Sequence, residues 1–332
     1  MPCSGHRNYV AGSVETMSWD VSGVRITRVV EHVMALPLDF FAEATPADVA
    51  AEAWLMPDFV TADGEYLMSL QTFVIEAGDL RIVVDTCIGN SKDRPLIPEF
   101  NQQDRPFLTK LAAAGFPPET IDFVVCTHLH VDHVGWNTRL LDGEWIPTFP
   151  RARYLFGAGD IECWSHSSDP LHAPSFADSV QPVIDAGLAD SVDTDTALTR
   201  DVHLKMTPGH TPGHMSVWIG ERCVITGDVL HHPIQFRHPQ WTARGDADPD
   251  AARATRRALL AAAVTTNALV LGTHFAGTSA GRIFRPTTAT ASRPNPDDCR
   301  RSAVGAVEAA TTRPRPSALS AAYQRQPRNP RP

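Results

Sequence analysis

The side chains best suited to chemistry lie in residues 127–136, which read Thr-His-Leu-His-Val-Asp-His-Val-Gly-Trp. They follow an apolar run that reads as a strand buried on both faces. At the end of such a strand His128 and His130 point the same way, while Asp132 and His133 can turn toward a second point nearby. Imidazole nitrogens and carboxylates are ligands for zinc and other divalent metals. The spacing therefore predicts a metal site rather than a loop that happens to be rich in histidine.

Three later segments carry further residues of the ligand type. One reads Thr-Pro-Gly-His-Thr-Pro-Gly-His and holds His210 and His214 in a turn made by glycine and proline. Two others, Cys-Val-Ile-Thr-Gly-Asp and Ala-Leu-Val-Leu-Gly-Thr-His, read as short apolar strands that lead into Asp228 and His274. One apolar strand that leads into a residue of the ligand type is weak evidence, but four such strands in one chain are strong evidence that these residues converge.

The order of these motifs resembles that of the metallo-β-lactamase superfamily, over roughly residues 24–284. The resemblance implies an α/β fold, a four-layer αββα sandwich with a binuclear metal site at one edge of its two sheets. The first metal would be held by His128, His130 and His210, the second by Asp132, His133 and His274, with Asp228 bridging the two. We expect His214 to support a ligand by hydrogen bonding. Asp85 would lie beside the metals by the same resemblance, or else be a turn-initiating aspartate of a hairpin.

A mechanism follows from the metal chemistry that the resemblance implies. Two divalent ions about 3.5–4 Å apart share a hydroxide, lower the pKa of the parent water to roughly 7 and polarise a carbonyl or phosphoryl oxygen of the substrate. No serine or cysteine nucleophile is needed. Asp132 and Asp228 would lie beside the metal-bridging hydroxide and are candidates for proton transfer. We expect zinc in both positions, with iron, manganese and cobalt as alternatives because they accept the same ligands.

Several features narrow the choice among members of the superfamily. Asp228 stands where the commonest subclass of antibiotic-degrading enzymes carries a cysteine ligand, which argues against that activity. His133 and His274 complete the second metal position, which disfavours a mononuclear iron oxidoreductase of the persulfide dioxygenase type. The first motif lacks the glutamate of flavodiiron proteins, and the C-terminal residues do not resemble the helical domain of glyoxalase II, although a thioester hydrolase stays an alternative.

Residues 227–236, together with the helix expected after Asp248, resemble the branch that contains methyl parathion hydrolase and related lactonases. Lactonases of the best-known type carry a tyrosine three positions after the bridging aspartate, and His231 stands there in this chain. Either His231 acts as a substrate contact and general acid, or it packs at the start of a loop. We expect a metal-dependent hydrolase that acts on a small ester or lactone, with phosphotriester cleavage as a side activity.

Five aromatic residues raise a similar choice. They either line an apolar pocket near the metals or belong to ordinary packing. They are Trp136, Trp164, Phe236, Trp241 and Phe275.

Composition bounds the class of protein. The 332 residues carry a formal net charge of −9, which argues against a nucleic-acid partner. No run approaches the ~18 apolar residues that cross a membrane, and the first seventeen residues lack the apolar core of a signal peptide. The six cysteines form no Cys-x-x-Cys pair, as is typical of reduced thiols in a cytoplasmic protein.

The chain divides into three parts on pattern alone. We expect a flexible N-terminal extension at 1–20, with Met1 or Met17 as the true start, and a catalytic domain at 21–285. Residues 286–332 hold eight arginines and three acidic residues among many Pro, Ala, Ser and Thr, so we expect a disordered tail and a second sheet without its final strand.

Within the domain, turn and capping signals predict the main elements. Strands are expected at 24–34, 69–76 and 80–85, and helices at 104–115 and 248–264. The aromatic segment 50–68 either lines a substrate mouth or covers a sheet edge, and its apolar surface would suit contact with a second copy in a homodimer.

Overall fold

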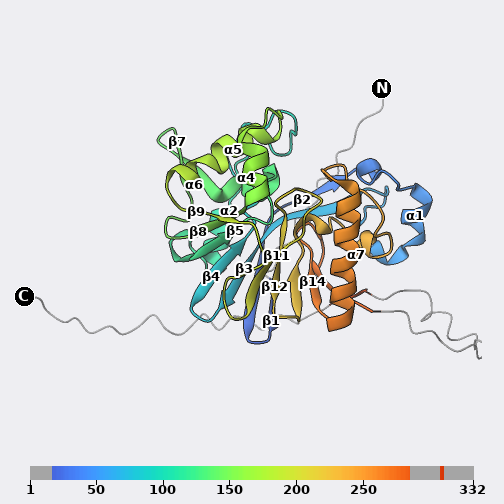
Figure 1. Cartoon of the computed structure of the whole chain (residues 1–332). Helices are drawn as coiled ribbons and strands as arrows, with labels where there is room; N and C mark the ends of the chain where they lie inside the picture. Colours follow the sequence, from blue (N-terminus) through green and yellow to red (C-terminus); the bar gives the residue numbers. More distant parts are fainter. Residues whose placement is uncertain (1–16, 285–306, 310–332) are drawn as a thin grey trace, which may run out of the picture.

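A computed structural model describes residues 17–284 and 307–309 of the chain. What was expected of residues 1–16, 285–306 and 310–332 therefore falls outside the described part. Two seven-stranded sheets form the centre of the molecule (Figure 1). The first sheet has the order β1 (Met17–Val21), β2 (Val24–Leu36), β3 (Tyr66–Ala77), β4 (Leu80–Val84), β5 (Phe123–Val125), β8 (Arg153–Gly157) and β9 (Ala189–Val192). The second has the order β10 (Thr196–Ala197), β11 (Val202–Met206), β12 (Met215–Ile219), β13 (Cys223–Ile225), β14 (Leu269–Leu271), β15 (Ala280–Ile283) and β16 (Val307–Ala309). A separate hairpin joins β6 (Thr138–Leu141) to β7 (Glu144–Pro147).

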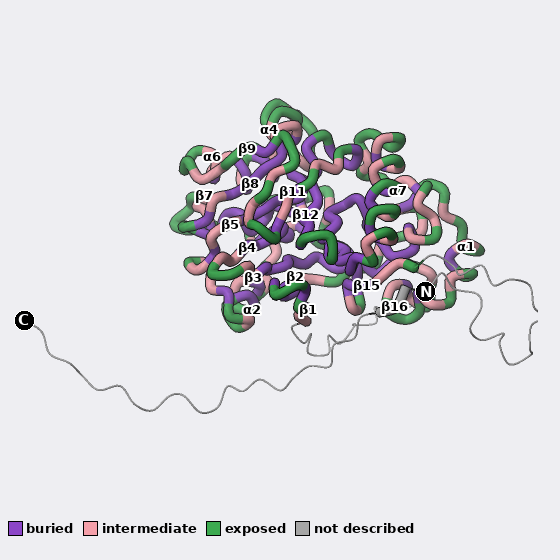
Figure 2. The backbone as a smooth tube through the Cα atoms, turned by 60° about the horizontal axis from the view of Figure 1, so that its bottom comes forward, coloured by how far each residue is buried: buried purple, intermediate pink, exposed green. Residues whose placement is uncertain are grey.

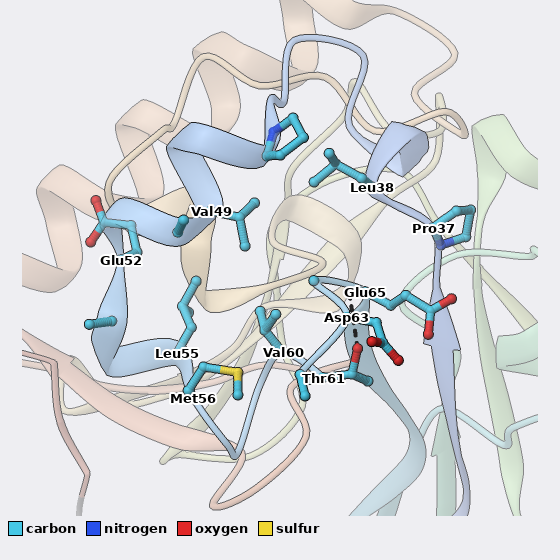
Figure 3. Close-up of a pocket in the computed structure, with 15 residues that line it drawn as sticks. Pro37, Leu38, Val49, Glu52, Leu55, Met56, Val60, Thr61, Asp63 and Glu65 are labelled. Atoms are coloured by element: carbon cyan, nitrogen blue, oxygen red, sulfur yellow. Dashed lines mark hydrogen bonds between the residues drawn. The ribbon is translucent and has the colours of Figure 1, made fainter. Parts of the chain in front are cut away.

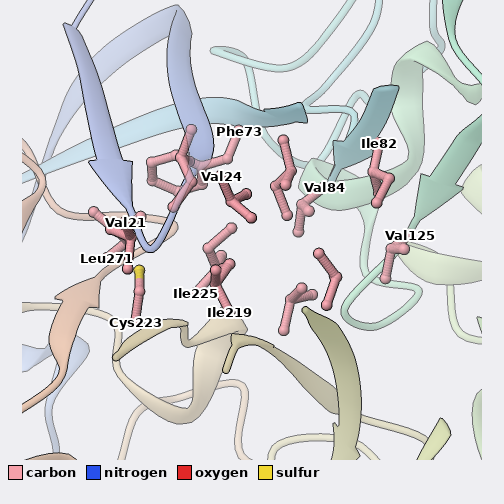
Figure 4. Close-up of a cluster of buried hydrophobic side chains, with 14 of the residues drawn as sticks. Val21, Val24, Phe73, Ile82, Val84, Val125, Ile219, Cys223, Ile225 and Leu271 are labelled. Atoms are coloured by element: carbon pink, nitrogen blue, oxygen red, sulfur yellow. The ribbon is translucent and has the colours of Figure 1, made fainter. Parts of the chain in front are cut away.

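The side chains of the central strands alternate between two apolar layers, as the two-residue period of a strand requires. In β13, Cys223 and Ile225 face the first sheet, while Val224 faces the opposite way. In β4, Ile82 and Val84 likewise point toward the second sheet. Figure 4 shows Ile82, Val84, Cys223 and Ile225 meeting between the sheets. The two sheets therefore share one core, and the outer face of each needs a further cover.

Helices supply that cover on both sides. Helices α2, α4, α5 and α6 pack on the outer face of the first sheet, and α7 packs on the outer face of the second. The α-helices are α1 (Pro46–Ala51), α2 (Phe107–Ala113), α3 (Val131–Val134), α4 (Ala158–Ser165), α5 (His172–Ser179), α6 (Gln181–Asp185) and α7 (Pro249–Thr266). The 3-10 helices are η1 (Leu38–Phe40), η2 (Ala53–Leu55), η3 (Pro118–Thr120), η4 (Gly135–Asn137), η5 (Gly227–Val229) and η6 (Pro233–Phe236). The expected αββα sandwich is confirmed, and Figure 2 shows the buried residues following the strands.

The element boundaries differ from the expected ones in three places. Strand β1 begins at Met17, so the first sheet includes residues that were assigned to the N-terminal extension. Helix α2 is shorter than the expected 104–115, because Pro106 is its N-cap rather than part of its first turn. The expectation that the second sheet lacks a final strand is wrong. Strand β16, within the tail that was expected to be disordered, pairs antiparallel with β15 and closes that edge.

The aromatic segment before β3 packs rather than remaining open. Its residues Leu55 and Val60 join Phe41, Tyr66 and Trp241 in an apolar cluster. Of the two alternatives for residues 50–68, this contact favours a cover over the sheet where β2 ends and β3 begins. Among the helices of the described residues, none has the length and apolar character needed to cross a lipid bilayer.

Candidate metal centre

The residues of the ligand type lie where strands of both sheets end. His128 follows β5, His210 follows β11, Asp228 follows β13 and His274 follows β14. Strands β5, β8 and β9 are parallel, as are β13 and β14, so their carboxyl ends meet at one edge. The residues that directly follow a buried strand leave the apolar core, so polar side chains can lie there while the strand itself stays buried. This edge therefore gathers polar groups that the apolar strands could not accommodate.

A first group consists of His128, His130 and His210. One ring nitrogen from each lies within 4.8 Å of the others. The Nε2 atom of His210 is 3.0 Å from Nδ1 of His130. All three side chains are buried, and burial, followed by the neighbouring imidazoles, holds the pKa values of His128 and His130 well below their usual range. His128 and His130 are therefore neutral, which is the form of imidazole that binds a metal.

A second group consists of Asp132, His133 and His274, and its ligand atoms also lie within 4.8 Å of one another. The Nε2 atoms of His133 and His274 are 3.1 Å apart. Asp132 Oδ2 is 3.6 Å from His274 Nε2. The Asp132 side chain is 20% exposed, whereas the two imidazoles are buried, so Asp132 lies on the open side of the group.

Asp228 lies between the two groups. Its Oδ2 atom is 3.4 Å from His210 Nε2 in the first group and 3.5 Å from His133 Nε2 in the second. Its Oδ1 atom is 3.1 Å from His274 Nε2. Burial alone would raise the pKa of Asp228, but the imidazoles around it, His274 first, hold that pKa well below its usual value. The structure thus brings all seven sequence-predicted residues together around one carboxylate.

The donor set fits divalent metal ions. Within the described residues, the buried Nε2 atom of His128 has no hydrogen-bond partner. A buried polar atom without a partner destabilises the folded chain, and a bound metal ion would supply the partner that this ring nitrogen lacks. Two ligands on one tetrahedral ion, each bonded at 2.0–2.1 Å, lie about 3.3 Å apart. The contacts of 3.0 and 3.1 Å between imidazole nitrogens are close to that spacing.

In the second group, the outer nitrogens of His274 and His133 each face an oxygen atom. His274 Nδ1 donates to the carbonyl of Ser69 at 3.0 Å. His133 Nδ1 lies 3.1 Å from Asp85 Oδ2, and Asp85 also accepts hydrogen bonds from Thr127 N and Oγ1. Asp85 therefore supports a member of the second group directly, and the hairpin alternative is not needed to explain it.

His214 supports Asp228 rather than joining either group. Its Nε2 atom accepts a hydrogen bond of 2.9 Å from the Asp228 main chain, and its Nδ1 atom donates to Thr207 Oγ1 at 2.8 Å. Burial lowers the pKa of His214 to about 3, which keeps Nε2 free to accept. The adjoining Gly227 has φ +53°, and a β-carbon there would lie 2.6 Å from His214 Nε2. Glycine is required at this position by both conformation and space.

Asp160, at the start of α4, is a functional residue that sequence reasoning missed. Its carboxylate accepts hydrogen bonds from Leu129 N at 3.0 Å, Thr211 Oγ1 at 2.9 Å and Gly213 N at 2.6 Å. Leu129 separates the two histidines of the first motif, and the other two donors lie in the Gly/Pro turn. Asp160 therefore joins the two loops that carry the first group. Nothing in its local sequence distinguishes it from an ordinary helical aspartate.

His231 points into the centre. Its Nε2 atom is 3.2 Å from Asp228 Oδ2, and its ring lies 4.8 Å from that of His210 between centroids. Burial lowers the pKa of His231. Its neighbour His232 points away, donating from Nε2 to Phe59 O and accepting from Ile234 N. Of the two alternatives for His231, the structure favours the one in which the ring takes part in the site.

The five aromatic residues mostly pack. Trp136 stacks on Phe107, Phe236 meets Phe275 edge to face, and Trp241 joins the cluster around Phe41. Trp164 differs, because its ring lies 5.5 Å from that of His130. It packs there beside His172, whose ring stacks on His130 at 4.4 Å. Sequence reasoning did not single out His172, which follows a loop without any motif.

A Gly-x-Ser-x-Gly pattern and a surface cavity also occur in the described residues, and neither belongs to the metal centre. Residues 277–281 read Gly-Thr-Ser-Ala-Gly, a pattern of serine hydrolases, but Ser279 is buried and bonded to Arg28 and the Phe275 carbonyl. A cavity of about 410 Å³ lies among residues 37–65, and no residue of the two groups lines it (Figure 3). Neither feature is part of the constellation around Asp228.

Comparison with known proteins agrees with the motifs and the fold. The family model described as "Metallo-beta-lactamase superfamily" matches residues 69–274. An N-acyl homoserine lactonase of Bacillus sp is 27% identical over 169 residues, which cover 47% of this chain and 60% of the relative. The probable metallo-hydrolase YybB of Bacillus subtilis (strain 168) is 26% identical over 171 residues, which cover 51% of this chain and 66% of the relative. The chain thus spans about six tenths of the length of that lactonase.

Two solved structures share the fold over most of the chain. The hydrolase AbOPH of the beta lactamase superfamily superposes with a TM-score of 0.66 at 21% identity, covering 82% of this chain and 94% of that one. AidC, a dizinc quorum-quenching lactonase, superposes with a TM-score of 0.66 at 20% identity, covering 82% and 95%. At this identity the likeness concerns the fold.

Proposed function

This chain belongs to the metallo-beta-lactamase superfamily, and from that membership we propose that it is a binuclear metal-dependent hydrolase that opens a lactone or cleaves a small ester. The observation that carries the proposal is the position of Asp228. Its oxygens lie within 3.1–3.5 Å of imidazole nitrogens from both groups. A carboxylate shared in this way supports two metal positions rather than one, and the completeness of both groups weighs against a mononuclear iron oxidoreductase.

The proposed ligand assignment follows the two groups. His128, His130 and His210 would hold the first metal, Asp132, His133 and His274 would hold the second, and Asp228 would be shared. Zinc is the metal we propose, in keeping with the dizinc relative of the same fold, with iron, manganese and cobalt as alternatives. When bound, two such ions supply a water of lowered pKa and polarise the carbonyl that is attacked.

The chain's own residues then handle the protons. Asp132 lies on the open side of the second group, where its carboxylate can accept the proton that the attacking water loses. His231 holds a proton at Nε2, 3.2 Å from Asp228 Oδ2, and can donate it to the alkoxide that leaves when the ester bond breaks. The proton that Asp132 accepted from the water then returns to His231, so both side chains end in the state in which they began. Burial alone would raise the pKa of Asp228, but the surrounding imidazoles, His274 first, hold it well below its usual value, so the shared carboxylate is charged in the metal-free protein.

The substrate class rests on two kinds of support. Relatives that match this chain in sequence are N-acyl homoserine lactonases, so we propose a lactone as the first substrate to test. The position of His231 gives independent support, because hydrolysis of an ester or lactone needs a proton for a leaving oxygen. Phosphotriesters present the same need with a phosphoryl centre and are the second class to test.

The test is metal-dependent proton release from a long-chain acyl lactone. Zinc-loaded protein should release protons on lactone addition, and a chelated sample should not. Substituting Asp228→Ala should lower kcat at least 100-fold, since removing one carboxylate disrupts both metal positions. Asp250→Asn, an exposed change at the start of α7, is the control and should retain wild-type turnover.

Two outcomes would contradict the proposal. Turnover that persists without metal would exclude the mechanism, and unchanged turnover in Asp228→Ala would remove the role of the shared carboxylate. Hydrolysis of phosphotriesters or thioesters without lactones would keep the hydrolase and replace the substrate. Oxygen uptake with one iron per chain would instead identify the oxidoreductase.

A further inference from the structure

A buried ion pair lies beside the first group of ligands, in contact with His210. The side chains of Asp246 and Arg256 are both 0% exposed, with 3.4 Å between Asp246 Oδ2 and Arg256 Nη2. Asp246 precedes α7, and Arg256 lies in the middle of that helix. Two buried charges of this kind are costly to remove from water unless further hydrogen bonds satisfy them. Their remaining contacts show what the pair holds in place.

Asp246 holds His210. Its Oδ1 atom accepts a hydrogen bond of 2.9 Å from His210 Nδ1, and its Oδ2 atom accepts one of 3.1 Å from Ala243 N. Because a carboxylate accepts only from N–H, His210 carries its proton at Nδ1. The other nitrogen, Nε2, then presents its lone pair toward His130 Nδ1 at 3.0 Å and Asp228 Oδ2 at 3.4 Å. The Asp246 carboxylate thus selects the tautomer that can bind a metal.

Arg256 ties this carboxylate to the segment of the shared ligand. Its Nε atom donates to the Val229 carbonyl at 2.8 Å, directly after Asp228. Its Nη1 atom donates to the Trp241 carbonyl at 2.8 Å and to that of Pro239 at 3.1 Å. A planar guanidinium can satisfy several acceptors at once in a fixed geometry, which a lysine cannot do. One side chain therefore fixes the loop that leads to Asp246 and the strand end that carries Asp228.

We propose that Asp246 and Arg256 are positioning residues for the first metal, through His210 and the main chain beside Asp228. The inference rests on the proposed function in that it requires the first group to bind a metal. Asp246 would then have the same role at the first metal position as Asp85 at the second, where Asp85 lies 3.1 Å from His133. Each position then has one histidine oriented by a buried carboxylate. Loss of such an outer partner typically costs 10–100-fold in metal affinity.

The test measures metal binding rather than turnover. Wild-type protein and the Asp246→Asn and Asp246→Ala variants are loaded with cobalt(II) and titrated with a competing chelator. We expect one of the two ions to bind about 10–100-fold more weakly in both variants and the other to keep its wild-type affinity. The visible absorption bands of the weakened cobalt should change, which a purely structural role would not cause. Asp246→Glu, which keeps the carboxylate, should restore part of the affinity.

The controls separate positioning from folding. Asp250→Asn removes an exposed carboxylate near the same helix start and should leave both ions and their spectra unchanged. Arg256→Lys keeps the charge but not the three carbonyl contacts, so it should lower the affinity for the same ion. It is the variant to use if the aspartate variants fail to fold. If folded Asp246 and Arg256 variants keep the wild-type metal affinity and cobalt spectra, the proposal that these two residues position the first metal is wrong. A wild-type protein that binds a single ion, still weakened by Asp246→Asn, would overturn the binuclear proposal and leave the pair standing.

Discussion

At the scale of single residues, His231 separates this chain from the lactonases that carry tyrosine three positions after the bridging aspartate. Its ring is enclosed by His210, Phe40 and Asp228, and its Nε2 atom faces the carboxylate at 3.2 Å. This position suits a proton donor, but it also suits a metal ligand, because His210, Asp228 and His231 form a set within ligand distance of one another. The two roles predict different consequences when the imidazole is removed.

We expect His231→Gln to lower kcat about 10²–10⁴-fold while both metal ions remain bound, because it removes a proton donor and no ligand. His231→Tyr supplies a phenolic donor and should recover part of that loss. The measurement is lactone turnover, with metal content determined on the same samples. His238→Gln, a change in a partly buried histidine of the same segment, is the control. Loss of one metal ion in His231→Gln would assign His231 as a ligand, and kcat within about threefold of wild type would leave it without a role.

At the scale of elements, helix α4 joins two loops that are far apart in sequence. Asp160, in its first turn, accepts hydrogen bonds from the loop after β5 and from the turn between β11 and β12. The contact is close, since a β-carbon on Gly213 would lie 2.5 Å from Asp160 N. The two loops that carry the first group of ligands therefore depend on one carboxylate for their relative position.

We expect Asp160→Asn to lower the free energy of unfolding by about 1–3 kcal/mol, because the amide nitrogen would face a buried N–H donor and leave it unsatisfied. Turnover should fall as well, since the first group loses its support. Urea unfolding of the metal-free protein measures the stability. Glu162→Gln makes the same chemical change at an exposed position of the same helix, and it should stay within about 0.5 kcal/mol of wild type. Equal stability of the two variants would show that Asp160 does not join the loops.

The elements also show what local sequence can predict. Helix α7 begins where Asp248 and Pro249 indicate, because the aspartate accepts hydrogen bonds from Asp250 N and Ala251 N and proline suits the first helical position. Strand β16 was missed because its three residues carry no apolar run, and pairing with β15 decides its conformation. The convergence of the histidines was predictable, since strand ends locate them. The partners Asp160, Asp246 and Arg256 were not, because each acts through contacts with distant segments.

At the scale of the whole molecule, stability depends on the protonation of buried histidines, and burial lowers the pKa of several of them. His232 is a clear case, because both ring nitrogens are used in the neutral form and it belongs to neither ligand group. Burial lowers its pKa from 6.5 to about 4. The unfolded chain therefore binds a proton between these values while the folded chain does not. The contribution of His232 to stability is complete above pH 6.5 and is lost progressively as the pH falls to about 4.

This linkage can be isolated by comparing pH slopes. Metal-free wild type should lose about 1.4 kcal/mol per pH unit between pH 6.5 and 4 from His232 alone, in addition to what other buried histidines contribute. His232→Asn keeps an acceptor for Ile234 N and cannot titrate, so its unfolding free energy should fall less steeply by that amount. Any constant cost of losing the bond to Phe59 O shifts the curve at every pH without changing the difference in slope. Urea unfolding at half-unit steps measures both curves. Parallel curves would mean that His232 titrates alike in the folded and unfolded chains, so that burial at the start of η6 is too weak to exclude its proton.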